Sequence, residues 1–494
     1  MKPNWLLIIA LLCTGAIAVW GVMDAAGLAE VAAAIVAEQF GARGWFIMLN
    51  ATFMLLISGY LMFSRYGNIK LGGEFDQPEF STISWLSMLF AAGMGVGLLF
   101  YAAAEPLTHY RFFEDKEAQQ SANGALFVTN FHWGLHAWAI YAMTGLVIAY
   151  FSFRKSLPTL VGASIPAVLG ENKLTLAVAW LCNLLAIVAI AIGLAGSVAL
   201  GVFQVQQGVN QLAGWEYSGM QTTLTIFVVL CVAFTLPLLV DLSKGMAVLS
   251  NIAMSIAVLL MIFVLVTGPT SYLMGSTFQS IGDYFGNVVQ HGFRTFTFMD
   301  ESINNWFSDW TLNYMVWWLA WAPFVGVFIA RISRGRTIRE YLIGVIFVPT
   351  MFSIVWFGIF GGVGFFGVLR TDLPLLEIVS TNIDAVTFFV LQQFPLTTLT
   401  TALVVVAAFL FVVTSVVSAA FVLAMFSTNG NLEPSVKVKL SWGAVLGALG
   451  LVMILSGSVS SVRSIIAVGA LPFVFITLLL VVCLLKSLKQ EESE

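Results

Sequence analysis

Twelve long stretches of this chain contain no charged residue, and this pattern limits the possible folds more than any other feature. A helix needs about 20 apolar residues to cross the hydrocarbon core of a bilayer. Backbone groups find no water there, so a spanning segment must pair them internally as a helix. We therefore predict an all-α membrane protein with twelve transmembrane helices, in the runs 5–22, 45–64, 82–104, 125–151, 174–201, 221–240, 246–268, 312–330, 341–360, 396–427, 441–457 and 464–485.

The composition excludes a soluble domain of this size. Of the 494 residues, 60% are hydrophobic and 9% are charged, whereas soluble domains carry about 25% charged residues. The four cysteines all lie inside apolar runs, which argues against a disulfide framework. We expect no nucleic-acid partner, and the lipid bilayer is the surrounding that this composition fits.

The basic residues predict the orientation. If all twelve runs span and the N-terminus is cytoplasmic, 15 of the 21 Lys and Arg residues fall inside and 6 fall outside. This bias agrees with the excess of Lys and Arg in cytoplasmic loops. We therefore expect a multi-pass protein of the inner (plasma) membrane with both termini cytoplasmic.

The spacing of the runs predicts five segments. Five spans precede the long connection 269–311 and five follow it, so the second set enters the membrane in the opposite sense, as in inverted-repeat transporters. Residues 28–40 and 276–291 are amphipathic and are expected to lie at the outer interface. The predicted units are 1–80 (two N-terminal transmembrane helices with an interfacial segment), 81–270 (first five-helix repeat), 271–311 (interfacial linker), 312–485 (second repeat) and 486–494 (short cytoplasmic tail).

Each predicted repeat begins with a helix that contains helix-breaking residues. Gly93, Gly95 and Gly97 lie in the first and leave a backbone that can unwind close to a ligand. Pro323 lies in the second and removes a backbone hydrogen bond. The alternative for Gly93 and Gly97 is a small-residue seam for helix packing. The paired interruptions favour a binding site near the midplane.

Two aromatic groups lie deep in apolar runs, each on one helical face. Such residues usually belong to the headgroup belt, but a belt explains poorly those far inside the 27-residue run 125–151. A cluster of Trp and Tyr faces binds a quaternary ammonium group by cation–π attraction. No run contains Asp or Glu, which argues against a carboxylate proton relay and favours sodium as the driving ion. The two groups are Trp133, Trp138 and Tyr141, and Trp317, Trp318 and Trp321.

Three motifs resemble the betaine/carnitine/choline transporter family, and the resemblance covers about residues 45–485. They are the glycine segment leading to Ala104-Glu105-Pro106, the run FHWGLHAWAIYA at 131–142, and Asp309-Trp310-Thr311 followed by WWLAWAPFVG at 317–326 and FIARISRGRTIREY at 328–341. The resemblance implies twelve helices, with two five-helix inverted repeats (a LeuT-like core) behind two extra helices. Members often form trimers, so it also implies a homotrimer.

The resemblance also implies the site residues. For the substrate it indicates the six aromatic residues named above together with Gly93, Gly95, Gly97 and Phe324. For sodium it indicates Ala91, Met94, Phe411, Thr414 and Ser415. The hydroxyls of Thr414 and Ser415 have the alternative of bonding back to the preceding helical turn. Ile190 and Leu194 stand where relatives with a second sodium site have threonines, which favours a single sodium.

These observations predict a secondary active transporter, not an enzyme, that imports glycine betaine or a similar zwitterion with sodium by alternating access. No cofactor is expected beyond the coupling ion. Choline carriers of the family tend to have Asp where this chain has Gly97, so Gly97 favours a substrate with its own carboxylate. The alternative is a sodium-independent exchanger or a proton-coupled carrier of carnitine, choline or dimethylsulfonium compounds.

Overall fold

The computed structural model describes residues 3–93, 95–112, 118–239 and 243–493, and its regular elements in these ranges are all helices. Extended pairing in the described residues is limited to one isolated bridge between Lys70 and Thr337. Eleven described helices are long and apolar enough to cross a membrane: Trp5–Met23, Ala25–Phe63, Ser121–Arg154, Lys173–Ala213, Met220–Leu239, Met246–Thr267, Glu301–Ile332, Ile338–Arg370, Thr397–Ser427, Val436–Leu455 and Phe473–Glu491.

The predicted span 82–104 is not one continuous helix. It is divided into α3 (Thr82–Gly93), α4 (Val96–Phe100) and α5 (Ala104–Phe112). Gly95 has an extended backbone at the start of α4. The glycines therefore coincide with an interruption, as their low helix propensity predicts, and this explains why eleven continuous helices stand where twelve were predicted.

The predicted interruption at Pro323 is absent, and this prediction was wrong. α14 (Asn313–Ile332) continues through Pro323 as a regular helix. The irregular turn of this segment precedes it, as the π-helical stretch η4 (Phe307–Leu312) after α13 (Glu301–Trp306). Proline is tolerated inside membrane helices where neighbouring groups satisfy the freed carbonyl.

Two interruptions were not predicted. Gly134 separates α6 (Ala118–Trp133) from α7 (Leu135–Ala149), and the turn at Leu471 and Pro472 separates α20 (Val459–Ala470) from α21 (Phe473–Ser493). The apolar run 464–485 therefore joins parts of two helices. A continuous run of apolar residues gives no sign of such breaks, because apolar side chains are equally compatible with a continuous helix and with two helices that meet at a turn.

The two amphipathic segments are both helical. Residues 28–40 form part of the 39-residue helix α2 (Ala25–Phe63), which follows α1 (Trp5–Met23). The second segment belongs to α12 (Thr270–His291), where Phe278 and Phe285 are exposed and Tyr284 and Val288 are buried.

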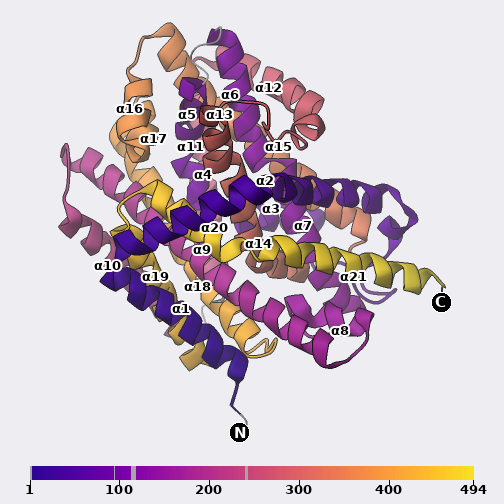
Figure 1. Cartoon of the computed structure of the whole chain (residues 1–494). Coiled ribbons are helices and arrows are strands. Elements are labelled where there is room, and N and C mark those ends of the chain that lie inside the picture. Colours follow the sequence, from indigo (N-terminus) through magenta and orange to yellow (C-terminus); the bar gives the residue numbers. More distant parts are fainter. Residues whose placement is uncertain (1–2, 94, 113–117, 240–242, 494) are drawn as a thin grey trace.

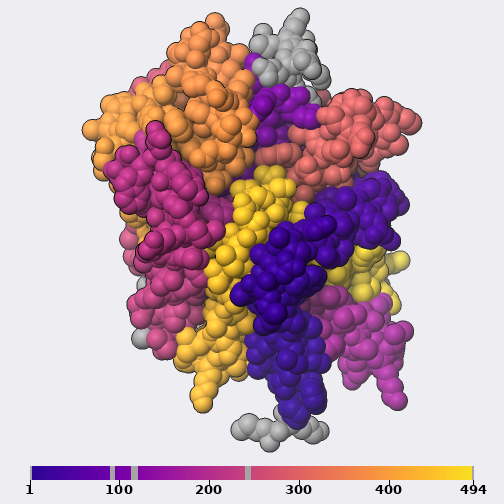
Figure 2. Space-filling model, turned by 60° about the vertical axis from the view of Figure 1, so that its left-hand side comes forward, coloured from indigo at the N-terminus to yellow at the C-terminus, as the bar shows by residue number. Residues whose placement is uncertain are grey.

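The interior is built from helices that are distant in sequence. α7 packs extensively against α14, and α9 (Lys173–Ala213) packs against α18 (Thr397–Ser427). α1 and α2 lie on the outside, next to the C-terminal segments α19 (Val436–Leu455) and α20 (Figures 1 and 2). The remaining elements are η1 (Arg65–Asn68), η2 (Tyr150–Arg154), η3 (Val161–Ala163), α8 (Ser164–Leu169), α10 (Met220–Leu239), α11 (Ser243–Thr267), α15 (Ile338–Arg370), α16 (Leu375–Thr381), η5 (Ile383–Ala385) and α17 (Val386–Leu391).

Three basic connections meet at one end of the bundle. Arg334 forms an ion pair of 3.2 Å with Asp76, and Arg154 donates to the carbonyl of Gly72 at 3.1 Å. Arg154 also pairs with Glu491 near the C-terminus. A hydrogen bond from the backbone N–H of Gly73 and one from the Arg334 guanidinium lower the pKa of the Asp76 carboxyl. The loops predicted to be cytoplasmic are therefore neighbours in space.

Candidate substrate-binding site

The aromatic residues of α6, α7 and α14 form one cluster in the interior. The ring centroid of Trp318 lies 5.1 Å from that of Trp133 and 5.6 Å from that of Tyr141, both in edge-to-face geometry. Trp138 contacts Tyr141 from behind at 5.6 Å. Such edge-to-face pairs fix the rings relative to one another, so this side of the cluster is rigid.

A small cavity of about 30 Å³ lies against this cluster. Six of the ten predicted substrate residues line it. Tyr141 and Phe324 do not line it but contact the lining residues Trp318 and Trp321. Trp138 in turn contacts Tyr141. Gly93 ends α3, where only the backbone course is described. The lining residues are Gly95, Gly97, Trp133, Ser197, Leu200, Tyr314, Trp317, Trp318 and Trp321.

Tyr314, Ser197 and Leu200 were not predicted as lining residues. Tyr314 stands three, four and seven positions before Trp317, Trp318 and Trp321, which is the spacing of one helical face. The sequence therefore carried the signal for Tyr314. Ser197 and Leu200 come from α9, whose apolar sequence gives no sign that this turn faces the cavity.

The glycine segment lets the backbone approach the rings closely. A Cβ atom on Gly97 would lie 3.2 Å from Cη2 of Trp133, and one on Gly95 would lie 3.6 Å from Trp321. Contacts near 3.2 Å are tighter than side chains normally make, so Gly97 is needed for this approach.

Two buried polar groups in the cluster have no hydrogen-bond partner among the described residues. They are the indole N–H of Trp321 and the hydroxyl of Tyr141. By contrast, the indole N–H of Trp318 donates to the carbonyl of His132 at 2.7 Å. A buried donor without a partner costs about 1–3 kcal/mol. Trp321 is therefore a lining residue whose buried donor is left unpaired.

A buried carboxylate lies directly behind the cavity, which corrects the prediction that no acidic group is available there. Glu105 is fully buried. It accepts hydrogen bonds from the indole N–H of Trp133 at 2.9 Å and from the hydroxyl of Tyr314. The prediction failed because the apolar run ended at residue 104, whereas burial continues into α5.

Glu105, His109 and His132 also form a compact group, with ligand atoms within 4.8 Å of one another. Their hydrogen-bonding groups are already paired: His132 Nδ1 lies 2.7 Å and His109 Nε2 3.4 Å from Glu105 Oε1. The geometry is therefore that of a hydrogen-bonded network. His136, one helical turn from His132, contacts Thr52 at 3.3 Å.

The predicted sodium residues are only partly described. Met94 lies outside the described residues, and Ala91 belongs to the end of α3, whose backbone alone is described. Phe411 is buried, and the Thr414 hydroxyl donates to the Leu410 carbonyl at 2.9 Å, the back-bonding alternative. Ser415 is half-buried on the next position of α18. α18 packs against α4, close to the glycine segment.

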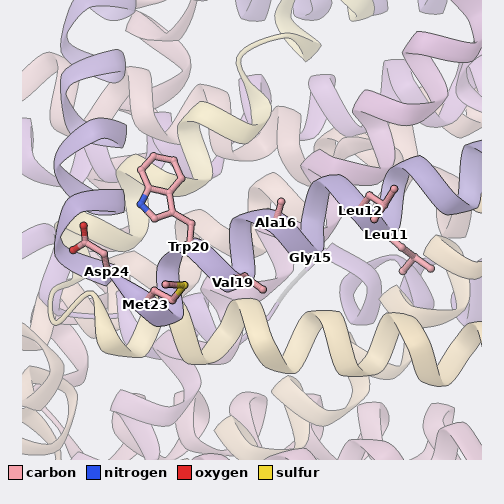
Figure 3. Close-up of a pocket in the computed structure, with 8 residues that line it drawn as sticks. All are labelled: Leu11, Leu12, Gly15, Ala16, Val19, Trp20, Met23 and Asp24. Atoms are coloured by element: carbon pink, nitrogen blue, oxygen red, sulfur yellow. The ribbon is translucent and has the colours of Figure 1, made fainter.

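A second hollow lies along the outer face of α1 (Figure 3). Its labelled side chains follow this one helix from Leu11 to Asp24, and apart from Asp24 they are apolar. This composition fits a lipid-facing surface, so the aromatic cavity remains the candidate site.

Comparison with known proteins decides the family. Residues 5–493 match the sequence profile of the BCCT, betaine/carnitine/choline family transporter. The chain belongs to the betaine/carnitine/choline transporter family. It is therefore a multi-pass membrane transporter of small molecules and not an enzyme.

Relatives within the betaine/carnitine/choline family include proteins named for betaine and for ectoine. The glycine betaine transporter OpuD of Bacillus subtilis is 39% identical over 492 residues, covering 98% of this chain and 94% of its own length. A glycine betaine transporter of Acinetobacter baylyi is 36% identical, and the match covers 91% of this chain and 68% of the length of that protein. The ectoine/hydroxyectoine transporter of Virgibacillus pantothenticus is 33% identical, and the match covers 91% of this chain and 89% of the length of that protein.

Proposed function

We propose that this transporter imports glycine betaine, or a closely related methylated zwitterion, together with sodium by alternating access. The observation that carries the proposal is the cavity lined by Trp133, Trp317, Trp318, Trp321 and Tyr314. A quaternary ammonium group offers no hydrogen-bond donor, so aromatic faces are its natural receptor, with cation–π attraction of about 2 kcal/mol or more once desolvated.

The carboxylate end of the substrate has a matching group. The indole N–H of Trp321 is a buried donor that lacks a partner among the described residues. Gly95 and Gly97 bring backbone to the same cavity. A zwitterion would use both kinds of group at once, whereas choline offers a neutral hydroxyl in place of the carboxylate and is a weaker hydrogen-bond acceptor. This supports glycine betaine over choline, and the ectoine carrier among the relatives adds ectoine as a second candidate.

Sodium coupling rests on α18 and the glycine segment. α18 carries Phe411, Thr414 and Ser415 and packs next to α4. The Thr414 hydroxyl donates a hydrogen bond to the Leu410 carbonyl of its own helix, so the lone pairs of its oxygen remain available to coordinate sodium. Ile190 and Leu194 are fully buried and apolar, which favours one sodium over two. A sodium-independent exchanger and a proton-coupled carrier are the alternatives.

The architecture proposed for this cycle has twelve transmembrane segments, the interrupted unit α3–α5 counting as one. Two inverted five-helix repeats would follow α1 and α2, and α9 and α18 would be equivalent third helices in contact with one another. The clustered basic loops support cytoplasmic termini. We propose the plasma membrane as the location and a homotrimer as the assembly.

Binding to the purified transporter tests the substrate. Isothermal titration with glycine betaine, ectoine, carnitine and choline in sodium buffer should give the tightest binding for glycine betaine. Trp318→Ala should lower that affinity at least about tenfold because it removes a central ring of the cluster. Trp215→Ala, at a half-exposed position (53%) after α9, should bind as the wild type does. Equal binding by Trp318→Ala and the wild type would refute the aromatic cavity as the site.

A further inference from the structure

Glu105 is held as an ionised carboxylate inside the bundle. The residue lies in the first turn of α5 and is fully buried. Its Oε1 faces His109 Nε2 and His132 Nδ1, and its Oε2 accepts from Trp133 Nε1 and the Tyr314 hydroxyl. Only the ionised form can accept from four donors at once.

The surrounding hydrogen bonds fix the proton positions of the two histidines. The indole of Trp306 can only donate, and it donates to His109 Nδ1 at 3.2 Å. A neutral His109 therefore carries its proton on Nε2, which faces Glu105. His132 Nε2 lies 2.9 Å from the Thr311 hydroxyl, which can donate to it and leave the His132 proton on Nδ1. Both rings then direct an N–H at the carboxylate and need no charge of their own.

The charge of Glu105 reaches the cavity through two of its lining residues. Trp133 and Tyr314 both line the cavity and both donate to the same carboxylate oxygen, Oε2. Only one side chain, that of Trp133 or of Tyr314, thus separates the carboxylate from the cavity. In a poorly polarisable interior a charge at that range acts far more strongly than in water.

We propose that Glu105 is the fixed counter-charge of the aromatic cavity and a positioning residue for specificity. Acting through Trp133 and Tyr314, it makes their rings more attractive to a cation and so sets the preference for the ammonium end of the substrate. A hydrogen bond to an anion shifts electron density toward the ring, and the negative ring face is what a cation binds. This inference rests on the proposed function, because it assumes that the cavity binds a quaternary ammonium group.

An arginine of α20 contacts other rings. The guanidinium of Arg463 lies 3.9 Å from the Trp310 ring centroid and 3.2 Å from the Tyr101 hydroxyl. Neither of these aromatic residues lines the cavity. The two hydrogen-bonded links into the cavity therefore come from Glu105.

A pair of ligands separates charge from shape. Glycine betaine and 3,3-dimethylbutanoate have the same shape, but a carbon atom replaces the cationic nitrogen in the second. The ratio of their dissociation constants in the purified transporter measures recognition of the cation alone. In Glu105→Gln this ratio should fall about tenfold, through a weaker affinity for betaine, while the affinity for 3,3-dimethylbutanoate stays within about twofold.

Two variants isolate the charge from the network. Glu105→Asp keeps the charge and should retain most of the wild-type ratio. Thr350→Val removes a buried hydroxyl that donates only to the Ile346 carbonyl of its own helix at 2.7 Å, outside this network, and should leave both the ratio and betaine affinity unchanged. If Glu105→Gln does not fold, Tyr314→Phe, which removes one donor and keeps the ring, should lower the ratio about threefold.

The outcomes separate the two proposals. A wild type that does not prefer betaine over 3,3-dimethylbutanoate would overturn the proposed function. A wild type with a strong preference that survives in Glu105→Gln, or in Tyr314→Phe where that variant stands in, would overturn the role of Glu105 alone. Equal losses for both ligands would assign Glu105 a structural role and likewise refute the proposal.

Discussion

Trp321 carries a hydrogen-bond donor that the protein itself does not use. Trp321 lines the cavity, and its buried indole N–H has no partner among the described residues. Trp321→Phe keeps an aromatic ring and removes this donor, so binding of glycine betaine should weaken about tenfold with little change in thermal stability. Isothermal titration and thermal unfolding measure the two effects.

Trp442→Phe is the matched control for that substitution. Its indole N–H donates to the Ser427 hydroxyl at 2.9 Å, in a fully buried position outside the cavity. This variant should lose stability and retain affinity. The reverse pattern, with Trp442→Phe weakening binding and Trp321→Phe leaving it intact, would contradict the role given to Trp321.

Gly97 keeps space for a ring that cannot move aside. Trp133 is fixed by its hydrogen bond to Glu105 and by its contact with Trp318, so a Cβ at 3.2 Å would strain the site. Gly97→Ala should therefore reduce betaine affinity several-fold. Gly59→Ala, where a Cβ meets nothing within 4 Å, should leave binding unchanged. Unaltered binding in both variants would show that Trp133 has room to shift.

At the scale of single residues, sequence reasoning was good where helical spacing places side chains. Trp317, Trp318 and Trp321 all line the cavity because helical periodicity brings them to one side of α14. Of the predicted face Trp133, Trp138 and Tyr141, only Trp133 lines it, because the helix is interrupted at Gly134. Glu105 was missed for a physical reason. A hydropathy pattern assigns a carboxylate to a solvent-exposed position, whereas the Glu105 carboxylate is buried and accepts hydrogen bonds from four donors.

At the scale of elements, the break at Gly134 depends on a helix from another part of the chain. The Tyr284 oxygen of α12 accepts from the backbone N–H of Leu135 at 2.6 Å, at the first residue of α7. Tyr284→Phe would leave this buried donor without a partner, which costs about 1–3 kcal/mol. We expect a lower unfolding temperature and weaker betaine binding, because α6 and α7 carry Trp133 and Tyr141 into the aromatic cluster.

Tyr341→Phe provides the comparison. The Tyr341 hydroxyl donates to the carbonyl of Ala142 inside α7 at 3.0 Å. A helical carbonyl keeps its backbone partner when this bond is lost, so the destabilisation should be smaller. A Tyr341→Phe variant that is as unstable as Tyr284→Phe would show that capping of the break is not the cause.

The element boundaries show what a single sequence can and cannot provide. The three glycines signalled the interruption between α3 and α4, because three such residues within five positions lower helix propensity together far more than a single glycine does. Pro323 signalled a break that the packing of α14 overrides, and Gly134 gave no distinct signal although its helix does break there. Tertiary contacts such as the one from Tyr284 decide these cases.

At the scale of the whole molecule, eleven of the twelve apolar runs overlap described helices long enough to cross a membrane, because lipid leaves helices as the only way to pair the backbone of a single segment. The arrangement of segments did not follow from them. Contacts such as α7 with α14 and α9 with α18 join parts of the chain separated by well over a hundred residues. The cavity likewise lies between distant segments, with α6, α9 and the glycine segment on one side and α14 on the other.

In the proposed cycle the cavity binds a methylated zwitterion and sodium drives its import. The most direct measurement is uptake of labelled glycine betaine into liposomes that contain the purified transporter, with and without an inward sodium gradient. We expect accumulation that requires the gradient and disappears in Trp318→Ala. Accumulation that ignores sodium and instead requires internal substrate would contradict the coupling and establish an exchanger.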